Sequence, residues 1–201
     1  KGEWKELNAV WLDRLAEGYR KVSTALISVF NKQGLAEFAA NLQQLGIKII
    51  STGGTRTVLE GAGLTVQRLE DVARFPEMLD GRVKTLQPEI YAGILARRVE
   101  EHLQQLTQLG LGTIDMVVCN FYPFEDVVSK PAVSFEEVIE NIDIGGPSMV
   151  RAAAKNHESV AVVTSPRQYG SVVEEMRGNN GCLSAESRRR LAETAFGLVA
   201  T

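Results

Sequence analysis

Short apolar runs alternate with amphipathic segments along most of the chain. Residues 24–30 (T-A-L-I-S-V-F) and 47–51 form two such runs, both rich in strand formers. Between them, the segment L-A-E-F-A-A-N-L-Q-Q-L repeats its apolar residues at helical spacing and stops at Gly46. Continuous apolar runs are typical of strands in a parallel sheet that is covered on both faces. The pattern therefore predicts a strand, a helix and a second strand.

The same alternation continues to the end of the chain. Further strands are predicted at 64–69, 114–120 and 160–164. The helices between and after them are predicted at 52–63, 71–79, 88–98, 100–109, 134–141, 147–156, 166–177 and 184–201. Strands that alternate with helices favour parallel pairing through right-handed crossovers. We therefore expect an α/β fold with a doubly wound, mainly parallel five-stranded sheet flanked by helices.

The segment 141–156 (N-I-D-I-G-G-P-S-M-V-R-A-A-A-K-N) predicts a helix that begins near Pro147, because proline suits a first helical turn. The backbone amides of 144–146 then lie at the positive helix end, where they can stabilise an anion or a developing oxyanion. Asp143 enters this end and Lys155 lies near the other. The two side chains either cap the helix and complement its dipole, or both touch one small substrate.

Two units are expected from the patterning. Residues 1–23 carry Trp4, Leu7, Trp11, Leu15 and Tyr19 at helical spacing, which predicts an amphipathic helical extension. Residues 24–201 form the remaining domain. With 201 residues and 44% hydrophobic content, the chain can bury one full core.

Composition and charge narrow the function classes. The net charge of −3, with acidic and basic residues mixed, gives no electrostatic footprint for nucleic acid. The apolar runs are shorter than a membrane span, and the opening residues show no signal peptide. Two cysteines and two histidines form neither a disulfide framework nor a metal-ligand pattern. We expect a reduced, cytoplasmic, metal-free protein.

Three polar loops follow predicted strands or lie close to strand ends. They contain Asn31-Lys32, Thr52-Gly53-Gly54-Thr55 and Arg82-Val83-Lys84-Thr85. Ligands of open parallel sheets bind beyond the carboxyl ends of the strands, and these loops supply hydroxyls, helix-start amides and cations. The chain has no Walker loop and no full G-x-G-x-x-G fingerprint. A small phosphorylated ligand is therefore expected.

Six motifs in this order carry a resemblance to a known family: S-V-F-N-K-Q-G-L, S-T-G-G-T, P-E-M-L-D-G-R-V-K-T-L, G-I-L-A-R-R, N-F-Y-P-F and I-D-I-G-G-P-S-M-V-R-A-A-A-K-N-H. Over residues 25–201 the chain resembles the inosine monophosphate (IMP) cyclohydrolase half of the bifunctional purine-biosynthesis enzyme. The resemblance implies a methylglyoxal-synthase-like fold and a homodimer. It also implies closure of 5-formamidoimidazole-4-carboxamide ribotide to IMP with loss of water, the last step of purine synthesis, without metal or cofactor.

The resemblance also assigns residues. The matching positions for the substrate phosphate and ribose are Ser28, Asn31, Lys32, Thr52, Gly53, Gly54, Thr55, Arg82 and Thr85. The matching base contacts are Cys119 and Asn120. Apart from the resemblance, the predicted helix start suggests that the amides of Ile144 and Gly145 would stabilise the reacting oxygen. The matching catalytic positions are Lys84, Tyr122, Asp143 and Lys155. Asp143 would orient or deprotonate the carboxamide, Lys155 would shuttle the proton, and Lys84 and Tyr122 would fix the substrate.

Three positions depart from the family pattern. Gln87 and Tyr91 stand where the family usually has histidines, and Phe30 replaces a serine beside the phosphate. Two alternatives remain open: methylglyoxal synthase, and a nucleotide-binding regulatory domain of the same fold. The second half of the bifunctional enzyme, a folate-dependent formyltransferase, is absent from these residues. If the chain is a fragment, we expect the intact protein to contain that half.

Overall fold

The computed structural model describes residues 17–122, 124, 128–129 and 133–200. The strands are β1 (Arg20–Lys21), β2 (Thr24–Val29), β3 (Lys48–Ser51), β4 (Gln67–Arg68), β5 (Met116–Asn120), β6 (Ala161–Val163) and β7 (Cys182–Leu183). The helices are α2 (Leu35–Gln44), α3 (Gly53–Gly61), α4 (Leu69–Ala73), η1 (Leu79–Gly81), α5 (Pro88–Leu95), α6 (Glu100–Gln108), α8 (Phe135–Glu140), α9 (Gly145–Lys155), η2 (Pro166–Gln168), α10 (Tyr169–Gly178) and α11 (Ala185–Ala200). Within these ranges, no helix is long and apolar enough to cross a bilayer.

Five strands form one parallel sheet in the order β4-β3-β2-β5-β6. This confirms the predicted α/β fold class and the doubly wound sheet. The chain moves outward from β2 to β3 and β4, and then returns to build β5 and β6 on the other side. The order therefore reverses between β2 and β5, where Ser28 pairs with Cys119 and Val29 pairs with Asn120. In such sheets the reversal point is where ligands bind.

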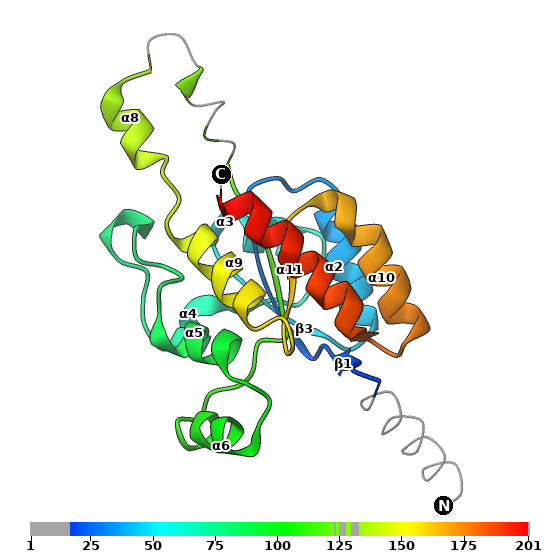
Figure 1. The fold of residues 1–201 in the computed structure, drawn as a ribbon. Coiled ribbons are helices and arrows are strands. Elements are labelled where there is room, and N and C mark those ends of the chain that lie inside the picture. The colour runs from blue at the N-terminus through cyan, green and yellow to red at the C-terminus, as the bar shows by residue number, and fades with distance from the viewer. Residues whose placement is uncertain (1–16, 123, 125–127, 130–132, 201) are drawn as a thin grey trace, which may run out of the picture.

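Helices cover the sheet (Figure 1). Their apolar stripes explain how they pack. In α2 the buried residues Leu35, Phe38, Ala39 and Leu42 follow helical spacing, and this helix packs against α10. In α9 the run Ala152–Ala154 is buried, and the small side chains allow close contact with β5, β6, α5 and α11. The start of α9 is thereby held near the carboxyl end of β5.

A buried carboxylate fixes the opposite end of the central strand pair. Asp115, 6% exposed, accepts hydrogen bonds from the backbone N–H groups of Ser23 and Thr24 at 3.0 and 3.1 Å. It also forms a 2.9 Å ion pair with Arg98, which donates to the carbonyl of Ile114 as well. The entrances of β2 and β5 are therefore joined through one side chain.

A small antiparallel sheet lies outside the main one. β1 pairs with β7, with Arg20 opposite Leu183 and Lys21 opposite Cys182. Beside it, the buried Arg188 donates to the carbonyls of Gly18, His157, Glu158 and Leu183. Burial lowers the pKa of the Arg188 guanidinium to about 10. Four carbonyls from three separate segments therefore share one cation.

The structure corrects several sequence predictions. The strand predicted at 64–69 is shortened to Gln67–Arg68, because Leu69 turns inward and begins α4. The helix predicted at 71–79 is replaced by α4, a loop and η1. Helix α9, predicted to begin near Pro147, begins two residues earlier, at Gly145. The Asp143 side chain accepts a hydrogen bond from the Gly146 amide and so caps this first turn. Most of the predicted N-terminal helix lies outside the described residues, and β1 and β7 were not predicted.

Replacing Asp115 by alanine tests the tie between β2 and β5. The change leaves two backbone N–H groups and the Arg98 guanidinium without their acceptor, so we expect the free energy of unfolding to fall by about 3–5 kcal/mol. Urea unfolding measures the change. The control is Glu193→Ala, which removes an exposed pair with Arg189 and is expected to cost under about 1 kcal/mol. Equal effects of the two substitutions would contradict the assignment.

Glu175 gives a pH-dependent prediction. Burial raises the pKa of this carboxyl, but hydrogen bonds from the Ser187 hydroxyl and the Ser184 amide outweigh it, so its pKa lies below 4.5. A depressed folded-state pKa stabilises the protein above pH 4.5, and this stabilisation is lost as the pH falls through the folded-state value. Urea unfolding at pH 7 should show Glu175→Gln less stable than wild type. The difference should shrink at pH below 4.5, and a constant difference would refute the prediction.

Candidate active site

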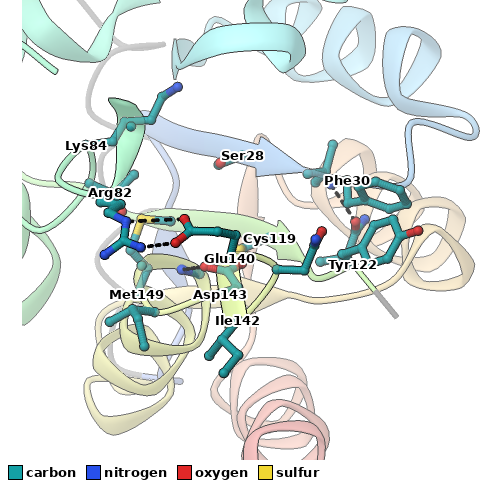
Figure 2. A pocket seen from close by; sticks show the side chains of 18 of the residues that line it. Ser28, Phe30, Arg82, Lys84, Cys119, Tyr122, Glu140, Ile142, Asp143 and Met149 are labelled. Carbon is teal, nitrogen blue, oxygen red and sulfur yellow. Dashed lines mark hydrogen bonds and ion pairs between the residues drawn. The ribbon is translucent and has the colours of Figure 1, made fainter. Parts of the chain in front are cut away.

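A cavity of about 700 Å³ opens where β2 and β5 end, at the reversal point of the sheet. Three parts of the chain form its walls: the ends of β2 and β5, the loop around η1, and the segment from α8 into α9 (Figure 2). Residues 28–30, 119, 120 and 122 supply the sheet side, and residues 139–146 lie across from the loop that carries Arg82 and Lys84. The cavity therefore has the position and the polar lining of a small-ligand site.

Asn120 fixes the floor of the cavity. Its Oδ1 accepts from the backbone N–H groups of Phe30 and Asn31 at 2.8 and 2.7 Å, and its Nδ2 donates to the Asn31 carbonyl at 3.1 Å. Lys32 donates to the carbonyls of Val29 and Phe30. The loop after β2 is therefore held by side chains that the sequence had suggested for ligand binding.

The start of α9 brings a carboxylate and backbone amides to the cavity. Asp143 Oδ1 accepts from the Gly146 N–H at 2.8 Å, and the side chain faces the cavity (Figure 2). A Cβ on Gly146 would lie 2.4 Å from Asp143 Oδ2, and one on Gly145 would lie 2.4 Å from Thr85 Oγ1. The two glycines are thus required for space, because side chains there would displace the carboxylate and the hydroxyl.

Two cations line the cavity, and each is paired with a carboxylate. Lys84 Nζ lies 2.9 Å from Glu77 Oε2. Arg82 forms a two-pronged contact with Glu140 of α8, with Nε 3.3 Å from Oε2 (Figure 2). In the same view, the Lys84 side chain points away from Asp143. The two cations therefore lie on different sides of the cavity, Arg82 toward α8 and Lys84 toward Glu77.

An aromatic pair forms another wall of the cavity. The Phe30 and Tyr122 rings meet edge to face, with centroids 4.3 Å apart and planes at 83°. Phe30 is 50% exposed, and both residues line the cavity. The serine usual at position 30 would supply a hydroxyl here, whereas this chain supplies a flat apolar surface against Tyr122.

Burial sets the protonation of two further groups near the site. It raises the pKa of the Cys119 thiol well above its usual range, and the nearby Asp143 charge raises it further. Cys119 is therefore a neutral thiol at neutral pH and is not an activated nucleophile. Burial likewise raises the pKa of Tyr91, which packs against the core and does not line the cavity. Gln87 is 5% exposed and also lies outside the lining.

Most of the residues suggested by sequence come together here. Those that line the cavity are Ser28, Arg82, Lys84, Thr85, Cys119, Asn120, Tyr122, Asp143, Ile144 and Gly145. Those that do not are Asn31, Lys32, Thr52, Gly53, Gly54, Thr55 and Lys155.

The structure gives a reason for two of the residues that lie outside the lining. The Thr55 hydroxyl both donates to the Val29 carbonyl and accepts from the Val29 N–H, at 3.0 and 3.1 Å, so it fixes the end of β2. Lys155 is exposed at the last residue of α9, about 15 Å along the helix from its start. Within this chain Lys155 does not line the cavity, and its contact with the same ligand as Asp143 stays a prediction.

Sequence reasoning missed the carboxylates that hold the two cations, Glu77 and Glu140. Glu140 falls within the helix predicted at 134–141, and nothing in its spacing points to Arg82. Glu77 had a signal, because Glu77 and Lys84 flank a turn-forming Asp80-Gly81 pair, as residues facing each other across a hairpin do.

The chain matches two family profiles and several curated relatives. The profile of the MGS-like domain matches residues 34–148, and that of the AICARFT/IMPCHase bienzyme matches residues 153–201. The bifunctional purine biosynthesis protein PurH of Desulfitobacterium hafniense is 55% identical over 176 residues, and that of Chlorobium phaeobacteroides is 50% identical over 179. These alignments cover 88% and 89% of this chain but 34% of each relative, so the chain spans about a third of their length.

A solved structure extends the comparison to the fold. The crystal structure of ForH superposes with a TM-score of 0.80 at 36% sequence identity, covering 89% of this chain and 91% of that chain. The MGS-like profile alone covers more than half of the chain. The chain therefore belongs to the MGS-like domain family, and its sequence matches one part of the bifunctional purine-biosynthesis proteins.

Proposed function

We propose that this chain is an IMP cyclohydrolase, which closes 5-formamidoimidazole-4-carboxamide ribotide to IMP. One observation carries the proposal: Asp143 and the first amides of α9 face the same cavity as Arg82, Lys84 and Thr85. A group that can accept a proton, amides that can bind a developing oxyanion, and cations for an anionic substrate thus share one site. The purine-biosynthesis relatives, at 50–55% identity, support the same substrate class.

The reaction requires these groups. The carboxamide nitrogen attacks the formyl carbon, a C–N bond forms, and the formyl oxygen takes up negative charge. This oxygen then leaves as water, carrying one proton from the carboxamide nitrogen and one from the formamide nitrogen. The residues must therefore remove a proton, stabilise an oxyanion and hold both reacting groups together.

Asp143 and α9 are suited to the first two tasks. One oxygen of Asp143 accepts from the Gly146 amide, which orients the carboxylate and leaves its second oxygen for the carboxamide. The amides of Ile144 and Gly145 lie in the first turn of α9, where helical N–H groups lack acceptors within the helix. We assign them to the formyl oxygen. Lys84 and Tyr122 remain assigned to holding the substrate.

The phosphate end of the site is assigned to the loop of Thr52, Gly53, Gly54 and Thr55. This loop does not line the cavity, but it lies next to Lys84. A Cβ built on Gly53 would be 2.8 Å from Lys84 Nζ. Lys84 thus lies between the cavity and the start of α3, where a phosphate can meet helix N-terminal amides. Asn31 and Lys32 remain predicted contacts on the neighbouring loop.

The role of Lys155 as a proton shuttle stays a prediction, because its exposed position at the end of α9 gives it no place in the cavity of one chain. We also propose that the intact protein is bifunctional, with a formyltransferase outside these 201 residues. The bifunctional relatives, of which this chain spans 34%, support that proposal. We further propose that the protein acts in the cytoplasm and that the cyclohydrolase reaction needs no metal or cofactor.

Asp143→Asn tests the assignment of the carboxylate. Asparagine keeps an oxygen that can accept from the Gly146 amide, so α9 stays capped while the charge is lost. We expect turnover of the formylated ribotide, followed by its ultraviolet change without folate or metal, to fall by about 10²–10⁴-fold. The control is Glu193→Gln, an exposed carboxylate outside the cavity. Near-normal turnover by Asp143→Asn would reject the proposed role.

The same assay separates the alternatives. Absence of wild-type turnover with tight IMP binding would identify a regulatory nucleotide-binding domain. Release of phosphate from a triose phosphate would identify a methylglyoxal synthase. Lys155→Ala is measured beside Asp143→Asn, and full activity of Lys155→Ala would remove Lys155 from the mechanism.

We also propose that the chain forms a homodimer through the segment around α8. This helix has no buried residue, and Figure 1 shows it standing away from the body of the domain. Its exposed apolar side chains continue toward α9: Phe135 is 80% exposed, Ile142 47% and Ile144 59%. An apolar surface of this kind on a projecting segment favours burial against a second copy.

Phe135→Asp tests the dimer. A charge in the centre of the proposed interface costs desolvation, so we expect the mass from light scattering to shift from dimer to monomer at micromolar concentration. Leu109→Asp is the matched control, because Leu109 is 62% exposed but lies at the end of α6, away from α8. A wild-type monomer, or a Phe135→Asp variant that stays dimeric, would refute this interface.

A further inference from the structure

The loop that carries the cations has a defined backbone geometry. Met78 and Val83 form an isolated antiparallel bridge, with the N–H of each donating to the carbonyl of the other at 3.0 and 3.3 Å. η1 closes the turn between them. Glu77 and Lys84 come directly before and after this bridge, so they face each other as a cross-strand pair. Their 2.9 Å ion pair follows from the bridge.

Two glycines leave room for this pair. A Cβ on Gly81 would lie 2.9 Å from Glu77 Oε1, and one on Gly53 would lie 2.8 Å from Lys84 Nζ. The carboxylate therefore packs against the backbone of its own turn, and the ammonium packs against the first residue of α3. Side chains at these two positions would push one or the other group away. The pair thus lies between η1 and α3.

Among the described residues, the other two carboxylates that line the cavity, Glu140 and Asp143, have partners of their own. Glu140 pairs with Arg82, and Asp143 Oδ1 accepts from the Gly146 amide. In Figure 2 Lys84 points away from Asp143, which leaves Glu77 as the carboxylate that sets its direction. Lysine has four rotatable bonds, so an ammonium without such a partner would sample many positions.

We propose that Glu77 is a positioning residue, which holds the Lys84 ammonium between the cavity and the start of α3. The inference rests on the proposed function, in which Lys84 fixes the anionic ribotide. The Glu77 and Lys84 side chains are 39% and 25% exposed, and pairs with such exposure contribute little to folding. The pair is therefore expected to matter for turnover and to have little effect on stability.

Glu77→Gln tests this role, since it keeps the shape of the side chain and removes its charge. We expect kcat for the ribotide to fall about tenfold while the unfolding midpoint stays near that of wild type. The control is Glu60→Gln on α3, which removes a carboxylate from an exposed pair with Arg56 and is expected to leave kcat unchanged. A purely structural role for Glu77 would instead lower the midpoint and spare kcat.

A double-mutant cycle shows whether Glu77 acts through Lys84. In a Lys84→Met background, Glu77→Gln should have no further effect on kcat, because the group that it positions is gone. If the two effects multiply, Glu77 acts independently of Lys84 and the inference is wrong.

A labelling experiment tests the contact without reference to activity. The purified variants are treated with a trace of acetic anhydride, and acetylation of each lysine is measured by mass spectrometry. Removing the carboxylate should raise the labelling of Lys84 several-fold, whereas exposed Lys48 on β3 should not change. Equal labelling of Lys84 in wild type and Glu77→Gln would overturn the proposed contact. Failure of wild-type turnover alone would reject the proposed function and the catalytic part of the inference, while the labelling would still decide the contact.

Discussion

The structure depends on the pairing of β2 with β5. One polar side chain secures each end of this pair: Asp115, just before β5, and Asn120, the last residue of β5. Asp115 binds the amides that lead into β2, and Asn120 binds the amides that lead out of it. Both contacts join residues about 90 positions apart in sequence. Because the order of the sheet reverses between these strands, the second contact also shapes the floor of the cavity. Stability and site geometry are therefore linked through one strand.

Close packing of charged groups against backbone is the second organising feature of the site. Asp143 packs on Gly146, and Lys84 packs beside Gly53. Each charged group is placed by the absence of a side chain opposite it, together with one hydrogen bond or ion pair. A side chain at either glycine would occupy the space that the charged group now fills. The glycine-rich motifs of the sequence thus have a steric purpose as well as a helix-starting one.

The sequence predicted the fold well, for physical reasons. The strands β2 and β5 are buried on both faces, so their apolar runs stand out, and the amphipathic helices between them show clear spacing. The short β1 and β7 were missed because two-residue strands carry no periodicity, and they depend on contacts between distant segments. The start of α9 was placed two residues late, since proline marks a first turn but does not fix its first residue.

The site was harder to predict than the fold. Residues next to strand ends, such as Ser28 and Asn120, follow from topology. The ion pairs of Arg82 and Lys84 do not, because the loop around η1 brings these cations to Glu140 and Glu77, and the path of that loop has no sequence period. Thr55 was predicted to bind phosphate, but its hydroxyl forms hydrogen bonds with the backbone of β2 and so has a structural role. Lys155 is exposed at the last residue of α9, as the alternative in which it complements the helix dipole would place it, and its catalytic role stays a prediction.

The cluster around Arg188 bears on how the chain folds during synthesis. Arg188 donates to the carbonyl of Gly18, a contact that spans 170 residues, and β1 pairs with β7 beside it. A ribosome releases the N-terminal residues first, so β1 emerges long before either of its partners exists. The first strand must therefore wait, unpaired, until the end of the domain has been made. Closure of this corner is a late event in folding, whereas the central sheet can assemble once β6 has emerged.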